Sequence, residues 1–360
     1  MGVRFTVENY RRAIRVYSGC GVIAAHNAMA EKVSPCQHRV TARFAAGKII
    51  MAKIVVVGSF NMDLTAYVER LPRPGETVHG NRFVTGPGGK GSNQAVAAAR
   101  LGAQVTFVGR VGKDMFGETA IELWQREGIN TRCVVRDPTL ATGVAPIVVE
   151  ERTAENAIVV VLGANTVLSP ADIDAAASEI ASVDVLLTQL EIPIATVQHA
   201  LELAKQHNVK TILNPAPSAP LPPALIAAVD YLTPNEIELN MLGGADESGS
   251  LTAYLTVEKK SRRLLVSDAQ VMVVTLGGQG AQWVTRSGTA LIPSFPVKAV
   301  DTTGAGDAFN AGLAVGLAEG KSLEDAIRLA HAAAALSVMK PGTATSMPTR
   351  DEVEAFLAQQ

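Results

Sequence analysis

Ordered structure is first indicated by Lys53-Ile54-Val55-Val56-Val57-Gly58, a run of β-branched residues closed by a glycine. A run of this kind predicts a β-strand. From there onward, short Val/Ile-rich runs alternate with Ala/Leu-rich stretches of helical length. This alternation predicts an α/β fold, a three-layer sandwich in which helices cover a mostly parallel central sheet.

The same pattern gives the expected elements. Further strands are expected at residues 105–109, 183–187, 211–213, 231–233 and 271–276, and another ending at Val300. Helices are expected at residues 92–100, 195–206 and 307–318. Gly102 and Asn208 suit the C-terminal stops of the first two helices. Residues 242–264 show no clear helical pattern.

Two regions interrupt the alternation. Residues 76–84 form one, and residues 144–149 and 156–162, joined by a polar turn, form the other. Both predict antiparallel strands. We therefore expect a domain of residues 51–360 with a small β-sheet lid, whose inserted strands lie near residues 63–84 and 143–162.

Residues 1–50 differ from the rest of the chain. They hold eight basic residues against only Glu8 and Glu31. An Arg-rich, acid-poor leader is typical of a targeting peptide. Met51 stands just before the first strand, however, so an upstream start or an expression-vector leader explains the segment equally well. Whether residues 1–50 are a targeting peptide or such a leader stays open, and the predicted fold does not depend on them.

Composition limits the partners. The 360 residues are 48% hydrophobic, 18% charged and 4% aromatic, with a net charge of −2. We expect a soluble protein with a small-molecule ligand, no nucleic acid and no membrane, because no basic stripe and no apolar run of about 20 residues occurs. Cys20, Cys36 and Cys133 form no CxxC pair, which favours a reducing, cytoplasmic compartment, although organellar targeting by residues 1–50 stays open.

The most informative motif is Asp301-Thr302-Thr303-Gly304-Ala305-Gly306-Asp307, which opens an apolar helix. A glycine-rich turn entering a helix directs backbone N–H groups and the positive end of the helix dipole at an anion. Asp307 would then be close enough to accept a proton from an attacking hydroxyl. The alternative is that Asp307 only caps the helix.

A second glycine-rich motif is Gly86-Pro87-Gly88-Gly89-Lys90-Gly91-Ser92-Asn93. It is no dinucleotide fingerprint, because that motif directly follows the first strand. It is no P-loop either, because Lys90 stands four residues after the first glycine instead of six, and Gly91 replaces Ser/Thr. A close-approach turn beside Lys90 and Asn93 suits a polyhydroxylated ligand.

Further polar groups follow the ends of other expected strands. Asn61 and Asp63 come just beyond the first strand, where ligands bind in open α/β sheets, although they could serve as turn residues only. Glu191 follows the strand at 183–187. Asn235 and Glu238 could organise Mg²⁺, often through water, or could cap a helix. The turn at 277–280 permits close passage of a nucleotide or is an ordinary hairpin turn.

Five segments together resemble the ribokinase family of carbohydrate kinases, which includes fructokinase and adenosine kinase: residues 58–63, 74–77, 88–95, 214–217 and 301–310. The resemblance covers roughly residues 52–360. It implies ATP-dependent phosphorylation of ribose at its 5-hydroxyl. It also implies a β-lid that often pairs two subunits as a homodimer, with ATP, Mg²⁺ or another divalent cation, and K⁺ as activator.

The resemblance also assigns roles. Asp307 would be the catalytic base, with an anion hole made by Gly304, Ala305 and Gly306. The sugar would be held by Asn61, Asp63, Gly89, Lys90, Asn93, Glu191 and Asp307. ATP would be bound by Asn235, Thr275, Gly277, Gly280, Gly306 and His331, and Mg²⁺ by Glu238 through water. The potassium ion would be held by Asp301, Thr303, Ser337, Lys340, Gly342 and Ser346.

Three rival functions are weighed. A related kinase acting on deoxyribose, fructose or a nucleoside would keep Asp307 and the anion hole but change the sugar contacts. The intact turn at residues 304–307 opposes a non-catalytic sugar sensor. The misplaced glycine motif opposes an NAD-dependent dehydrogenase.

Overall fold

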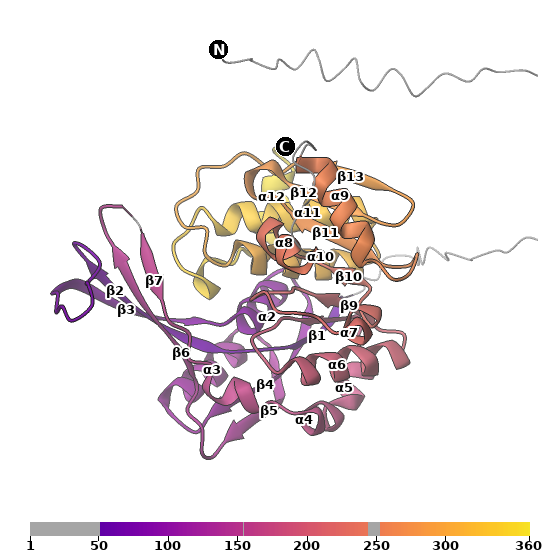
Figure 1. Cartoon of the computed structure of the whole chain (residues 1–360). Helices are drawn as coiled ribbons and strands as arrows, with labels where there is room; N and C mark the ends of the chain where they lie inside the picture. Colours follow the sequence, from indigo (N-terminus) through magenta and orange to yellow (C-terminus); the bar gives the residue numbers. More distant parts are fainter. Residues whose placement is uncertain (1–50, 154, 244–252) are drawn as a thin grey trace, which may run out of the picture. The chain divides into compact units, whose positions relative to one another are not determined.

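The computed structural model describes residues 51–153, 155–243 and 253–360. The predictions made for residues 1–50 lie outside these described residues. Two sheets occur in the described part of the chain, one of nine strands and one of four (Figure 1). Helices cover both faces of the larger sheet, so the expected three-layer α/β sandwich with a smaller sheet is confirmed.

The main sheet is mostly parallel. Its strand order is β13 (Thr289–Ile292), β12 (Ala281–Val284), β11 (Val271–Thr275), β10 (Tyr231–Leu232), β9 (Lys210–Leu213), β8 (Val185–Thr188), β1 (Lys53–Val57), β4 (Gln104–Gly112) and β5 (Asn130–Asp137). The pairs from β11 to β5 are parallel, and β12 and β13 add an antiparallel hairpin at one edge. The parallel strands therefore deliver their carboxyl ends to one edge of the sheet.

The first strand shows why the layers form. Ile54 and Val56 face one hydrophobic core and Val55 and Val57 face the other, and all four side chains are fully buried. Such a strand is stable only between two helical layers.

One core packs under α2 (Lys90–Arg100), α3 (Met115–Arg126), α10 (Ala305–Ala318), α11 (Leu323–Ser337) and α12 (Arg350–Leu357). The other packs under α4 (Pro170–Ala175), α5 (Ala177–Ala181), α6 (Ile194–Gln206), α7 (Pro223–Ala227), α8 (Glu236–Gly243) and α9 (Ala253–Leu264).

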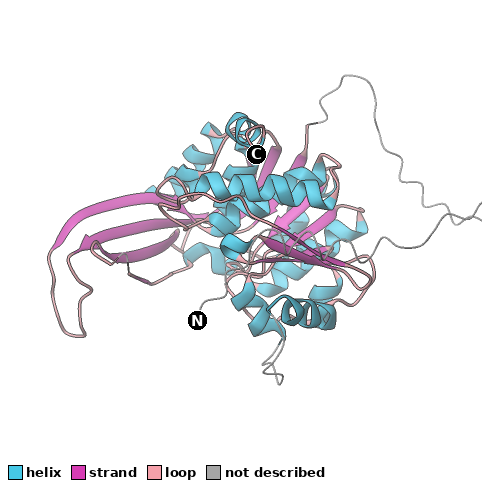
Figure 2. Cartoon of the chain, turned by 90° about the horizontal axis from the view of Figure 1, so that it is seen from above, coloured by secondary structure: helices cyan, strands magenta, loops and turns pink. Residues whose placement is uncertain are grey.

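The smaller sheet extends away from the main one (Figures 1 and 2). Its strand order is β3 (Gly80–Gly88), β2 (Asn61–Val68), β6 (Gly143–Glu150) and β7 (Asn156–Ile158). The outer pairs are antiparallel, but β2 and β6 run parallel. Short 3₁₀ turns lie at Gly163–Val167, Gly277–Gln279 and Ala344–Ser346. No described helix has both the length and the apolar character that crossing a bilayer requires.

One expectation about local structure was wrong. Residues 293–302 form no strand, so the chain reaches Asp301 through an irregular segment. Residues 242–264, where the sequence shows no clear helical pattern, include the regular helix α9. Of the two interpretations of Asn61 and Asp63, the turn is excluded, because both residues lie within β2.

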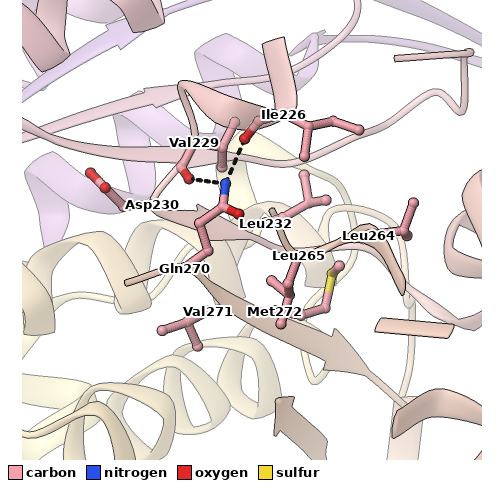
Figure 3. A pocket seen from close by; sticks show the side chains of 9 residues that line it. All are labelled: Ile226, Val229, Asp230, Leu232, Leu264, Leu265, Gln270, Val271 and Met272. Atoms are coloured by element: carbon pink, nitrogen blue, oxygen red, sulfur yellow. Dashed lines mark hydrogen bonds between the residues drawn. The ribbon is translucent and has the colours of Figure 1, made fainter. Parts of the chain in front are cut away.

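A small apolar cavity lies between α7, β10 and β11 (Figure 3). Its volume of about 10 Å³ holds no more than one water molecule. Gln270 lies beside it and donates from Nε2 to the carbonyl oxygens of Ile226 (2.6 Å) and Val229 (2.8 Å). Because Gln270 satisfies the end of α7 in this way, the cavity is a packing feature and not a ligand site.

Candidate active site

The glycine-rich turn that the sequence predicts to bind an anion lies at the N-terminus of α10. Gly304 is the N-cap and has a φ of 79°, a left-handed conformation that favours glycine. Just before it, Asp301 accepts hydrogen bonds from the backbone N–H groups of Thr303 (2.9 Å) and Gly342 (3.0 Å). Burial acts to raise the pKa of Asp301, but hydrogen bonds from the Thr303 side chain and from the backbone of Gly342 and Thr303 outweigh it and lower the pKa. The turn is therefore tied to the loop around Gly342.

Asp307 lies in the first turn of α10 and is only 5% exposed. Its carboxylate accepts hydrogen bonds from Asn93 Nδ2 and Gln94 Nε2 of α2, both at 3.0 Å. Since Gly304 begins the helix, and the side chain of Asp307 is bonded to another helix, the capping alternative for Asp307 is wrong. The structure places a buried carboxylate in the first turn of a helix whose N-terminus is predicted to bind an anion.

The turn before α2 packs tightly against the start of β2. Gly89 has a φ of 86°, and a Cβ atom there would lie 2.6 Å from the backbone nitrogen of Asn61. Only glycine fits this contact. As a result, Lys90 and Asn93 at the start of α2 lie beside Asn61 at the start of β2.

Glu191 joins these elements to the end of β8. Its Oε2 accepts hydrogen bonds from Ser59 Oγ (2.5 Å), the backbone nitrogen of Lys90 (2.9 Å) and Asn61 Nδ2 (3.4 Å). Asn165 in turn donates to Asn61 Oδ1 (3.1 Å). Side chains that are more than 100 residues apart in the sequence are thus fixed in one cluster.

Electrostatics in this cluster are dominated by carboxylates. Burial raises the pKa of Asp63 from 3.8 to about 6; a hydrogen bond from Thr343 opposes the rise, and repulsion by Glu191 and Asp307 adds to it. Burial lowers the pKa of Lys90, but attraction by Asp307, Glu191 and Glu238 outweighs it, so the net pKa is raised. A buried ammonium group surrounded by carboxylates suits the binding of hydroxyl groups.

All the residues predicted to hold a sugar are near one another. They come from β2, the turn into α2 and the segment after β8, together with α10. They are Asn61, Asp63, Gly89, Lys90, Asn93, Glu191 and Asp307, and the first six of them form the predicted hydroxyl-binding cluster.

A larger pocket adjoins the other side of the α10 N-terminus. Its volume is about 570 Å³, within the range of sites for nucleotide-sized ligands. Its walls come from the turn after β11, the segment 293–299, and helices α8, α10 and α11. All six predicted ATP ligands line it: Asn235, Thr275, Gly277, Gly280, Gly306 and His331.

His331 is 5% exposed and contacts the edge of Phe309. Its Nε2 lies 3.2 Å from the carbonyl oxygen of Ile292, which can only accept, so Nε2 carries the proton. Burial lowers the pKa of His331 to about 4. The pocket wall is consequently neutral at this position near pH 7.

The sequence left two interpretations open for Asn235 and Glu238, and the structure shows a capping box. Glu238 accepts from the backbone nitrogen of Asn235, and Asn235 Oδ1 accepts from that of Glu238, both at 2.8 Å. Burial raises the pKa of Glu238. Glu238 does not line the larger pocket, whereas Asn235 does.

Hydrogen bonds connect only some of the residues predicted to hold a monovalent cation. Asp301 contacts Thr303 and Gly342 as described above, and Lys340 donates to the carbonyl oxygen of Ser337 (3.2 Å). The Lys340 ammonium pairs with Glu352 (2.6 Å), and Ser346 bonds the carbonyl of Thr343. No group of three or more His, Cys, Asp or Glu side chains suited to a metal ion occurs among residues 51–153, 155–243 and 253–360.

Several residues that contact the predicted site residues were not identified from the sequence. Gln94 contacts Asp307, Ser59 contacts Glu191, and Thr343 Oγ1 lies 3.4 Å from Asp63 Oδ2. Ser59 and Gln94 stand inside the quoted motifs, so their position was a signal. Thr343 had none, because its partner lies 280 residues away.

A buried carboxylate that is hydrogen-bonded to a polar cluster, stands at a helix N-terminus and directly follows residues that line a nucleotide-sized pocket is the arrangement expected of a small-molecule kinase. Comparison with known proteins agrees. Residues 51–350 match the pfkB family of carbohydrate kinases. A ribokinase from Bacillus subtilis (strain 168) is 45% identical over 86% of this chain and 100% of its own length. A deoxyribokinase from Salmonella typhi is 38% identical over 85% of this chain and 98% of its own.

A solved structure has the same fold. The ribokinase of Arabidopsis thaliana, complexed with ribose and ATP, superposes with a TM-score of 0.77 at 32% identity, covering 86% of this chain and 99% of that one. The chain belongs to the pfkB family of carbohydrate kinases. It is therefore an enzyme.

Proposed function

We propose that this chain transfers the γ-phosphoryl group of ATP to the 5-hydroxyl of D-ribose. The observation that carries the proposal is the place of Asp307, which lies 3.0 Å from Asn93 of the hydroxyl-binding cluster and in the first turn of the anion-binding helix. The similarity to ribokinases from Bacillus subtilis and Arabidopsis thaliana supports ribose and ATP as the substrates.

Asp307 is the general base. The 5-hydroxyl gives its proton to the carboxylate of Asp307, and its oxygen forms a bond to the γ-phosphorus. The bond from that phosphorus to the bridging oxygen breaks, and its electron pair leaves with ADP. Gly304 and Gly306 direct backbone N–H groups at the charge that develops on the phosphoryl oxygens, whereas the N–H of Ala305 already donates to the carbonyl oxygen of Thr302 (3.2 Å). Because both reactants are held in place, positioning supplies much of the rate enhancement.

The sugar is held by Asp63, Lys90 and their neighbours in the hydroxyl-binding cluster. Asp63 accepts hydrogen bonds from adjacent sugar hydroxyls, for which it must be ionised. The small sheet that carries Asp63 acts as a lid and excludes water, which would otherwise be phosphorylated in place of the sugar.

Two metal ions complete the proposal. Although Glu238 caps α8, Mg²⁺ would be held through it and water, because its carboxylate lies near enough to Lys90 and Asp307 for their charges to shift its pKa, and phosphate oxygens would supply the other ligands. It would neutralise phosphate charge. Asp301 and Gly342 would take part in holding a potassium-type ion, because the hydrogen bond between them (3.0 Å) joins their loop to the turn at Gly304. Such an ion would stabilise that turn.

The lid also suggests a homodimer. Several of its apolar side chains are exposed, among them Phe83 at 64% and Val159 at 62%. Pairing two lids would bury them. Phe83→Glu should turn a dimer into a monomer in light scattering, and a wild-type monomer would overturn this part of the proposal. We keep a cytoplasmic location as a prediction from the cysteine pattern.

A substrate panel tests the activity. Deoxyribose is the main competitor, because a deoxyribokinase is 38% identical to this chain. Ribose, deoxyribose, fructose and adenosine are incubated with ATP and Mg²⁺, with and without K⁺, and the product is assigned by ³¹P NMR. Ribose 5-phosphate with the highest kcat/KM supports the proposal. Faster turnover of another substrate would show that ribose is not the preferred one. If none of the four gives a product, the proposed kinase activity is wrong.

A further inference from the structure

Three buried amide side chains lie behind Asp307. Gln94 comes from α2, Gln189 follows β8, and Asn214 follows β9. Gln94 and Gln189 are fully buried, and Asn214 is 6% exposed. The activity proposed above assigns no role to any of them.

The donor and the acceptor of each hydrogen bond among these amides can be assigned. Asn214 Nδ2 donates to the backbone carbonyl of Thr233 (3.2 Å), which can only accept, so Asn214 Oδ1 faces Gln94. Gln94 Nε2 donates to that oxygen (3.3 Å) and to Asp307 Oδ1 (3.0 Å). A backbone group thus fixes which end of the Gln94 amide faces Asp307.

The other end of Gln94 is fixed as well. Gln94 Oε1 accepts from Gln189 Nε2 at 2.5 Å. Both N–H groups and the oxygen of Gln94 are therefore engaged, and a rotation of the amide would bring its oxygen against the Asp307 carboxylate. Because Gln94 has two donors and one acceptor in use, it is a rigid support.

The two oxygens of Asp307 differ in consequence. Oδ1 is held by Gln94 inside the protein. Oδ2 accepts from Asn93 Nδ2 (3.0 Å), on the side of the hydroxyl-binding cluster. A carboxylate oxygen has two lone pairs, so Oδ2 keeps one for a substrate hydroxyl.

We propose that Gln94 is a positioning residue for phosphoryl transfer: it fixes Oδ1 of Asp307, so that Oδ2 takes the proton of the attacking hydroxyl. This inference rests on the proposed function, because it assumes that Asp307 is the base. The O–H bond of the sugar breaks, a bond from that hydrogen to Oδ2 forms, and the freed oxygen bonds to phosphorus as ADP leaves.

The test substitutes Gln94 by Met, which has a similar size but no amide donor. We expect kcat for ribose to fall about 10- to 100-fold, the effect of one hydrogen bond to a charged group. The KM values of ribose and ATP should stay within about threefold, because Gln94 touches neither substrate. Gln198→Met, the same change on α6, is the matched control and should leave kcat unchanged.

A double-mutant cycle separates positioning from a general structural role. In the Asp307→Asn background, Gln94→Met should lower the residual kcat by no more than about threefold, because the group it positions is already gone. A full 10- to 100-fold further loss in that background would overturn the proposal. So would a Gln94→Met enzyme with the kcat of wild type.

Folding is monitored by circular dichroism and thermal unfolding. If Gln94→Met does not fold, Gln94→Asn decides by the same criteria, because it stays uncharged and polar while its shorter side chain withdraws the amide donor from Asp307. Failure of the proposed function can be told apart from failure of this inference. If the proposed function is wrong, wild type phosphorylates no ribose. If only this inference is wrong, wild type is active and Asp307→Asn still loses activity as proposed.

Discussion

Asp63→Asn should stabilise the fold while it weakens ribose binding. Burial raises the pKa of Asp63 to about 6 from an ordinary value of 3.8. The folded protein therefore binds this proton more tightly than the unfolded chain does. As the pH rises from 3.8 to about 6, the unfolded chain loses the proton first, so the free energy of unfolding falls across this window.

The size of the effect follows from the pKa difference. Above pH 6 the ionised Asp63 costs the fold at most about 3 kcal/mol, since one pKa unit corresponds to about 1.36 kcal/mol. Asparagine carries no charge and removes this cost. We expect Asp63→Asn to raise the free energy of unfolding by about 1–3 kcal/mol at pH 8 and by about half as much at pH 5. The KM for ribose should rise at least about 100-fold.

Urea unfolding at pH 8 and pH 5 measures the stability, and steady-state kinetics measure the KM. Asp268→Asn is the matched control, because its side chain is 88% exposed. It should change stability by no more than about 0.5 kcal/mol at either pH. Equal stabilisation by Asp63→Asn at both pH values, or destabilisation at pH 8, would refute the reasoning.

Two further predictions concern the helix terminus and the nucleotide pocket. Gly304→Ala should lower kcat about 10-fold or more and destabilise the fold by about 1–2 kcal/mol, because the φ of 79° strains any side chain there; kinetics and urea unfolding check this, and a variant as active as wild type would contradict it. His331→Gln should reduce the loss of stability on acidification, since the folded pKa of His331 is about 4 and the unfolded chain takes up the proton from about pH 6.5 downward. The difference in free energy of unfolding between wild type and His331→Gln should therefore change by about 2 kcal/mol between pH 7.5 and pH 5; a constant difference would show that His331 does not titrate as argued.

Much of the main fold could be predicted from the sequence, because its evidence is local. Within the run of residues 53–57, the four side chains from Ile54 to Val57 are buried, so its composition reveals a central strand. β2 could not be recognised in the same way, because its polar residues Asn61 and Asp63 look like a turn. The parallel pairing of β2 with β6 joins segments about 80 residues apart and leaves no local pattern.

The same distinction applies to the candidate site: features set by local sequence could be predicted, and contacts that depend on packing could not. The glycine turns at Gly89 and Gly304 require special backbone conformations, and the sequence shows them directly. Whether Asp307 caps its helix or faces α2 depends on how the two helices pack, which no local pattern reveals. The capping box of Asn235 and Glu238 could be predicted, by contrast, because the two residues that bond each other are only three apart in the sequence.

The most direct test of the central claim compares wild type with Asp307→Asn in ATP-dependent phosphorylation of ribose. Substrate and ATP binding should change little, and kcat should fall about 10²- to 10⁴-fold, the contribution of a general base. Asp307→Asn keeps the size of the side chain, so a stable fold is expected and is checked by circular dichroism. A folded variant with the kcat of wild type would contradict the account.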